Sequence, residues 1–130
     1  MQNNNFTKFE NELISHFIWM NYEIVNIISS QFESARNIKR NFTGMGCFIS
    51  FEIDQSKSFS LKDIKFTAFD WPDIHSTELE DWAYTIFFFT KDGIFDCIEI
   101  VWKCWDFPER ELKDYRITDP GPINTIHSEL

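Results

Sequence analysis

Residues 84–105 read YTIFFFTKDGIFDCIEIVWKCW, two runs of aromatic and β-branched residues separated by Asp92-Gly93. Glycine adopts the positive φ of a tight turn, so an Asp-Gly pair between two such runs predicts a β-hairpin. Side chains alternate between the two faces of a strand, and residues 86–89 are all apolar, so we expect the first strand to lie centrally in a sheet. Glu99 and Lys103 share one face of the second strand, which indicates a partly exposed face or a position nearer the sheet edge.

The N-terminal part of the chain has helical periodicity. Between residues 6 and 34, apolar side chains recur at spacings of three and four, which is typical of an amphipathic helix. They are Phe9, Leu13, Phe17, Met20, Ile24 and Ile27. A single helix of about 25 residues would span about 37 Å. This is longer than a small domain usually needs, so we favour a break near Asn21, although the pattern itself leaves one helix or two open.

The remaining elements are weaker in the sequence. Gly44 and Gly46 precede an alternating run to residue 53, which predicts a strand, and residues 64–69 predict a third. We interpret residues 36–40 as a basic connector and residues 70–82 as a long acidic connection, with a short strand or turn at 115–117. The predicted fold is one α+β domain over residues 1–130: a helical segment (6–34) packed on a mainly antiparallel sheet of four to five strands (44–105), followed by a tail (106–130).

Composition restricts the class of partner. Asp and Glu total 21 against 12 for Lys and Arg, a formal charge of −9, and 18% of the residues are aromatic. Nucleic-acid binding depends on cations that neutralise phosphates, so we expect no nucleic-acid partner. A basic protein is the complementary partner for such a chain.

The cysteines and the apolar runs indicate the cellular compartment of the protein. Three cysteines do not form a disulfide framework, which favours a reducing environment. The N-terminus has no pattern of a secretory signal, and no apolar run is long enough to cross a bilayer. We therefore expect a cytoplasmic, soluble protein with no membrane association.

Catalytic motifs are missing from the sequence. Gly44 and Gly46 serve strand geometry, because neither a phosphate-binding nor a dinucleotide-binding glycine pattern surrounds them. His75 lies between Asp73 and Glu78, a set of donors that suits a divalent ion, yet no paired His or Cys motif accompanies it. We predict no catalytic residue, no metal and no cofactor, and we expect that the protein is not an enzyme.

The acidic connection is the predicted binding site. It holds five carboxylates in twelve residues without a Lys or Arg, and tryptophans lie near both of its ends. Such a segment imitates nucleic-acid phosphates toward a basic active site, and tryptophan is a frequent anchor in protein interfaces. The alternative is a solvated loop whose tryptophans belong to the core. The candidate partner-binding residues are Asp70, Trp71, Asp73, Glu78, Glu80, Asp81 and Trp82.

Residues 40–48, RNFTGMGCF, resemble a signature of small bacterial immunity proteins from contact-dependent growth inhibition and related polymorphic toxin systems. Further matches are Asp92-Gly93, Ile98-Glu99 and residues 105–108 (WDFP), whereas Cys47 replaces the expected aromatic residue and the acidic segment has no counterpart. The resemblance implies a stoichiometric inhibitor that occludes a cognate toxin C-terminal domain, usually a nuclease. The alternative function is a small ligand-binding or enzymatic α+β domain with a pocket under the aromatic sheet.

Overall fold

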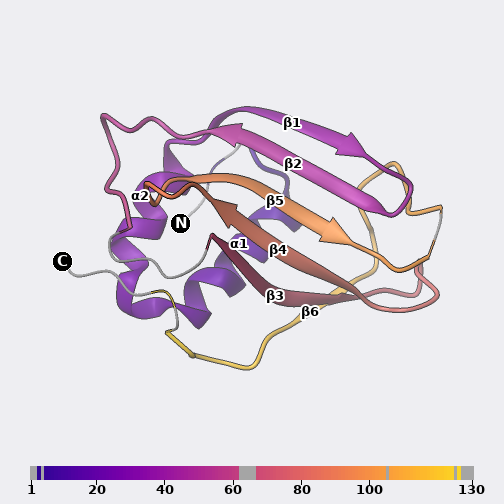
Figure 1. The fold of residues 1–130 in the computed structure, drawn as a ribbon. Coiled ribbons are helices and arrows are strands. Elements are labelled where there is room, and N and C mark those ends of the chain that lie inside the picture. The colour runs from indigo at the N-terminus through magenta and orange to yellow at the C-terminus, as the bar shows by residue number, and fades with distance from the viewer. Residues whose placement is uncertain (1–2, 4, 62–66, 105, 125, 127–130) are drawn as a thin grey trace.

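The computed structural model describes residues 3, 5–61, 67–104, 106–124 and 126 of the chain. Two helices precede a six-stranded antiparallel sheet (Figure 1), so the α+β prediction is confirmed with slightly more strands than the expected four to five. The sheet order is β1-β2-β5-β4-β3-β6. The elements are α1 (Lys8–Met20), the 3-10 turn η1 (Tyr22–Ile24), α2 (Val25–Glu33), β1 (Arg36–Phe42), β2 (Gly46–Glu52), β3 (Ala68–His75), β4 (Ala83–Phe89), β5 (Phe95–Val101) and β6 (Arg116–Thr118).

The helical segment is divided near Asn21, as expected. Thr7 caps α1: its hydroxyl accepts a hydrogen bond from the Glu10 N–H at 3.2 Å, and the Glu10 carboxylate accepts one from the Thr7 N–H at 2.9 Å. This reciprocal capping box satisfies N–H groups that have no partner inside the helix. Asn21 ends α1 with non-helical dihedral angles, and the chain resumes as η1 and α2. Two short helices therefore cover the sheet.

Aromatic rings form the centre of the core between the helices and the sheet. Phe17 of α1 stacks on Phe87 of β4 with ring centroids 4.2 Å apart, and it meets Phe69 and Phe95 edge-on at 5.0 and 5.3 Å. Phe17 and Phe87 are fully buried. Edge-on and offset contacts of this kind add about 0.5–1.5 kcal/mol per pair beyond the burial of apolar area. The apolar stripe read from residues 9–27 therefore faces the sheet.

A buried glutamine joins α2 to the central hairpin. The Gln31 amide donates to the carbonyl oxygens of Gly93 and Phe59 at 2.9 and 2.8 Å, and its oxygen accepts from the Phe95 N–H at 2.8 Å. Gly93 has a φ of 79° in the predicted Asp-Gly turn. A fully buried amide needs such partners, because an unpaired polar group in the interior is costly.

Three sequence interpretations are corrected. Residues 36–40, expected as a connector, belong to β1, an edge strand whose mostly exposed side chains hid its pattern. Residues 70–75, expected as part of a loop, continue β3. The strand predicted at 64–69 overlaps β3 only at Ala68 and Phe69, since 64–66 lie outside the described residues.

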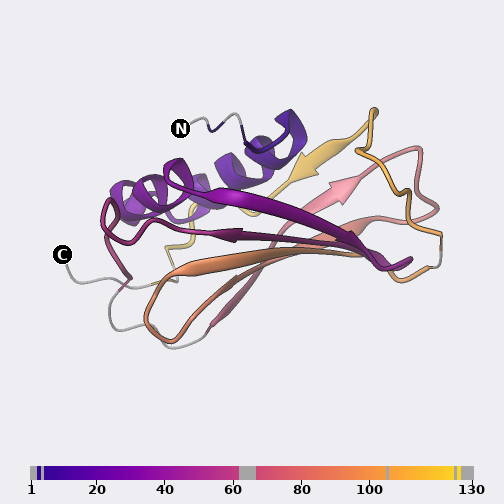
Figure 2. The ribbon, with the colours of Figure 1, turned by 90° about the horizontal axis from the view of Figure 1, so that it is seen from above.

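The central hairpin occupies the middle of the sheet. β4 lies between β3 and β5, as predicted, and β5 lies between β2 and β4 rather than near an edge. Glu99 was explained either by a partly exposed strand face or by a position nearer the sheet edge, and the partly exposed face is therefore correct. Figure 2 shows both helices on one side of the sheet, and no helix of the described residues lies on the other. We call this second side the open face.

Candidate functional site

Two of the predicted acidic residues lie on the open face. Asp70 pairs with Ile86 and Asp73 with Tyr84 across the β3–β4 ladder. Three positions separate the two aspartates but only two separate their partners, so β3 carries one extra residue in a bulge. A bulge is where a strand tolerates a proline, here Pro72, and it brings both carboxylates to the same face. Trp71, inside the bulge, is half-buried and packs against the core.

Glu78 has a different role, because its carboxylate is bound within the chain. It accepts hydrogen bonds from the backbone N–H groups of Lys113 and Asp114 at 2.7 and 2.9 Å, and it pairs with Arg110 at 2.5 Å. The Asp114 N–H, the Arg110 guanidinium and the Lys113 N–H lower the pKa of Glu78 to about 2. Glu78 therefore links residues 76–82 to the segment before β6 through these hydrogen bonds and this ion pair.

The last three predicted residues are exposed. Glu80 and Asp81 project from the turn before β4, and Trp82 retains 47% of its surface. The Lys103 ammonium lies 5.9 Å from the centroid of the Trp82 ring, close enough for a cation–π contact. The structure therefore divides the predicted set into two open-face aspartates, two groups used inside the fold, and an exposed turn.

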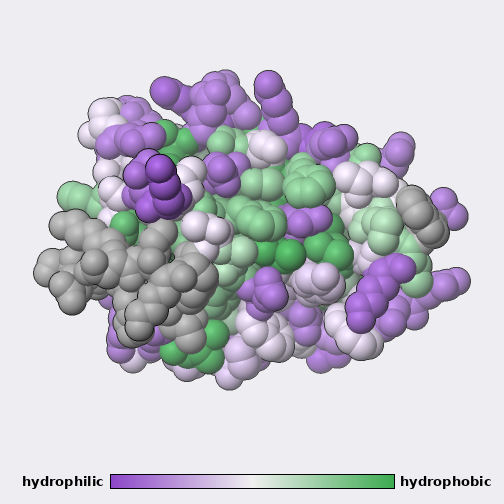
Figure 3. All heavy atoms as spheres, viewed as in Figure 1, coloured by the Kyte–Doolittle hydropathy of each residue, from purple (hydrophilic) through white to green (hydrophobic). Residues whose placement is uncertain are grey.

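The open face carries apolar side chains that the sequence analysis did not single out as a site. They are half-buried and come from the three central strands of this face, as the registers place them: Phe48, Tyr84, Ile86, Phe88, Cys97 and Val101. Figure 3 shows apolar residues gathered across the middle of this view, with hydrophilic residues around them. The signal in the sequence was the run of apolar residues on both faces of β4, from which only a central position in the sheet was predicted.

Several carboxylates on or beside this surface are partly removed from water. Burial raises the pKa of Asp73 above its usual value, against a smaller opposing effect of His75. Burial likewise raises the pKa of Glu99 and of Asp96. A raised carboxylate pKa means that the charged form is disfavoured where it stands.

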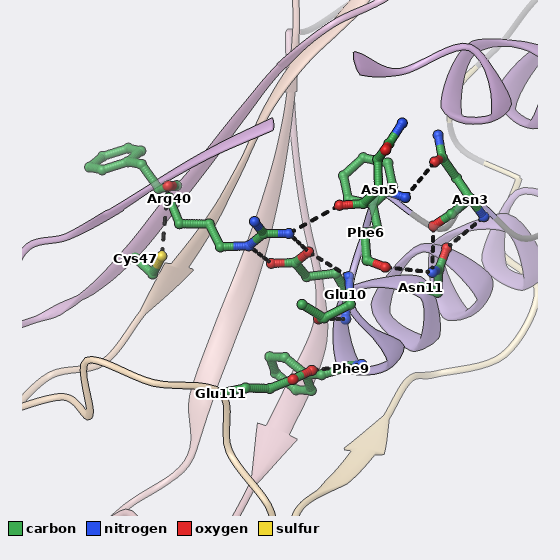
Figure 4. Close-up of polar contacts among 11 residues, drawn as sticks. Asn3, Asn5, Phe6, Phe9, Glu10, Asn11, Arg40, Cys47 and Glu111 are labelled. Atoms are coloured by element: carbon green, nitrogen blue, oxygen red, sulfur yellow. Dashed lines mark hydrogen bonds and ion pairs between the residues drawn. The ribbon is translucent and has the colours of Figure 1, made fainter. Parts of the chain in front are cut away.

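The opposite side of the sheet contains a cavity of about 280 Å³ beneath β1, β2 and β5. Its walls are largely apolar, from Phe9, Phe42, Ile49, Ile100, Phe107 and Leu112. At its rim the Arg40 guanidinium binds both oxygens of the buried Glu10 carboxylate, at 2.6 and 2.5 Å (Figure 4). Cavities with apolar walls and a few polar groups are typical of small-molecule sites.

Part of this region is built from residues 40–48, the segment on which the resemblance to immunity proteins rests. Residues 40–48 span the end of β1, its turn and the start of β2, and Arg40 points toward α1. Gly46 lies against the neighbouring strand, where a Cβ would stand 1.8 Å from the Ile100 carbonyl oxygen. Arg40 and Gly46 therefore have roles in the fold.

Among the residues that the structure describes, no group of three His, Cys, Asp or Glu side chains is placed to hold a metal ion. The His75 ring contacts the Thr118 hydroxyl at 3.1 Å. Burial is the main cause that raises the pKa of Cys47 and of Cys97 to about 11, so both thiols stay protonated at neutral pH.

Across the described helices, none has the length and apolar character needed to span a membrane. Comparisons of the chain with family models, with curated proteins and with solved structures find no match.

Proposed function

We propose that this chain is an immunity protein that binds and neutralises a cognate toxin domain, a basic nuclease, by occluding its active site. The protein acts by binding and performs no catalysis. The signature-like segment at residues 40–48 and the charge of −9 support the proposal.

The observation that carries it is the composition of the open face. Apolar side chains surround Glu99 in its central part, while Asp70 and Asp73 lie along β3. Protein interfaces combine a mostly apolar central part with a polar rim, and apolar side chains that keep part of their surface exposed on one sheet face suit such a central part. Carboxylates at one border select a basic partner and accelerate its approach.

The exposed turn before β4 extends this acidic border. Trp82 keeps 47% of its surface exposed, and Glu80 and Asp81 precede it. An exposed tryptophan beside carboxylates suits contact with a cationic surface, because tryptophan both buries area and attracts cations. We assign Glu80, Asp81 and Trp82 to the rim of the interface.

Bacterial growth tests this function. The C-terminal domain encoded immediately upstream is expressed with and without this chain, and we expect growth arrest in its absence and rescue in its presence. The control is an active-site variant of the toxin domain, which should be harmless in both cases. Toxicity without rescue, or a harmless upstream domain, would contradict the proposal.

The 280 Å³ cavity favours a second candidate function, the binding of a small apolar ligand. Under this function a ligand found by NMR screening raises the melting temperature of the protein. Glu109→Trp, a change at an exposed position of the cavity lining, would then block entry and abolish the shift. A screen in which no compound binds the wild-type protein counts against this candidate.

A further inference from the structure

Glu99 occupies the centre of the open face. It lies on β5 and pairs with Phe48 of β2 on one side and with Ile86 of β4 on the other. Its diagonal neighbours on those strands, at Gly46, Ser50, Tyr84 and Phe88, are uncharged. Residues directly and diagonally opposite are the ones within reach of a sheet side chain. The carboxylate therefore stands among uncharged, mostly apolar neighbours.

No Lys, Arg or His among the described residues forms an ion pair with Glu99 within 4 Å. The side chain is nevertheless half-buried. Removing a carboxylate from water without a partner costs free energy. A β-branched residue such as Thr or Val would suit this central strand position better. The fold itself thus does not account for a glutamate here.

The charges around Glu99 change sign across the face. Residues that pair directly across neighbouring strands form a row over five strands: Asn41, Phe48, Glu99, Ile86 and Asp70. At the β1 edge Lys39 lies opposite Ser50, and beyond the end of β5 Lys103 lies beside Trp82. The β3 side presents Asp70 and Asp73. Strands lie about 4.8 Å apart, so Glu99 and Asp70 are roughly 10 Å apart in this row. A docked partner is therefore oriented with its more basic part over β3.

We propose that the open face docks onto the toxin domain with an arginine of that domain inserted over Glu99, between Phe48 and Ile86, and a second cation facing Asp70 and Asp73. A planar guanidinium binds a carboxylate with two parallel hydrogen bonds and stacks on an aromatic ring such as Phe48. Arginine suits this position better than lysine, whose ammonium is more strongly hydrated. The inference rests on the proposed function, since it names the contact that the inhibitor makes.

A second copy of this chain is a poor occupant of the same face. In a two-fold symmetric dimer the same surface meets itself. Glu99, at its centre, would then approach the Glu99 of the other copy. Two half-buried carboxylates of like charge repel, and each copy carries a net charge of −9. Charge complementarity therefore selects a basic partner over self-association.

The test is calorimetric titration of the purified chain with a catalytically inactive toxin domain. We compare wild type, Glu99→Gln and Glu99→Arg with the matched control Glu33→Gln, which removes an equal charge from an exposed position in α2, on the other side of the sheet. Loss of one member of a desolvated charge pair weakens binding by roughly 30-fold or more. We expect this loss for Glu99→Gln, no measurable binding for Glu99→Arg, and less than about three-fold change for Glu33→Gln.

The second measurement is the melting temperature of each variant in the absence of the toxin domain. Glu99→Gln removes a poorly solvated charge, so its melting temperature should equal or exceed that of wild type, which separates lost binding from lost folding. Ile86→Thr keeps a β-branched shape beside Glu99 and should also weaken binding.

The possible failures are distinct. Absence of wild-type binding overturns the proposed function and this contact together. Equal affinity of wild type and Glu99→Gln overturns the Glu99 contact and leaves the function standing. A concentration-dependent dimer of the free chain that Glu99→Arg abolishes overturns the choice of partner.

Discussion

At the scale of single residues, Glu78 shows how a carboxylate predicted to bind a partner can be used within the fold. Its pKa is lowered from 4.5 to about 2 by two backbone N–H groups and Arg110. A group with a lowered folded-state pKa stabilises the protein above its unfolded pKa, and that contribution disappears as pH falls toward the folded pKa. The stabilisation by Glu78 should therefore be complete at neutral pH and decline between about 4.5 and 2.

The measurement is urea unfolding of wild type and Glu78→Gln at neutral pH and in steps down to about pH 3. We expect the difference in free energy of unfolding to be largest at neutral pH and to shrink below about pH 4.5. The variant Glu80→Gln, at an exposed position in the same turn, is the control and should show little difference at any pH. A Glu78→Gln difference that is constant with pH would contradict this role.

At the scale of elements, the close approach of β2 to β5 depends on Gly46. Its φ is 148°, and a Cβ there would lie 1.8 Å from the Ile100 carbonyl oxygen. Because that oxygen belongs to a central strand, Gly46→Ala must separate the two strands. We expect a loss of about 2–4 kcal/mol in the free energy of unfolding.

Gly121 provides the matched control for this prediction. It has a φ of 88°, and apart from its two chain neighbours no atom of the described residues lies within 4 Å of an added Cβ. Gly121→Ala should cost only the backbone strain, about 1–2 kcal/mol. Urea unfolding of both variants gives the comparison, and equal losses would show that the β2–β5 approach is not the cause.

At the scale of the whole molecule, we expect the net charge and the open face to act on different steps of the proposed binding. Exposed carboxylates steer encounter, so Glu80→Lys with Asp81→Lys should lower the association rate with a basic toxin domain by about ten-fold at low salt. Raising ionic strength from about 50 to 500 mM should remove most of that difference, because salt screens exposed charges. Glu99→Gln, in contrast, should act mainly on dissociation.

Stopped-flow binding measures both rates. Circular dichroism of the double variant should match wild type, because Glu80 and Asp81 are exposed. An association rate that is insensitive to both the double change and salt would place the acidic turn outside the encounter surface.

The amino-acid sequence alone determined the local elements of this protein. The hairpin at residues 84–105, the helical stripe with its division near Asn21 and the strand after Gly46 all follow from patterns within a few residues. Such patterns are strong because apolar periodicity and turn geometry are local properties. β1 escaped prediction because an edge strand has few apolar residues.

Tertiary structure alone decided which of these residues are free to bind. Glu78 finds its partners more than thirty residues away at Lys113 and Asp114, and Glu99 became central through the strand order. β4 is apolar on both faces, yet two short helices cover only one of them. Which face of the sheet the helices cover depends on packing between distant segments. No local pattern in the sequence therefore distinguishes the open face from the core.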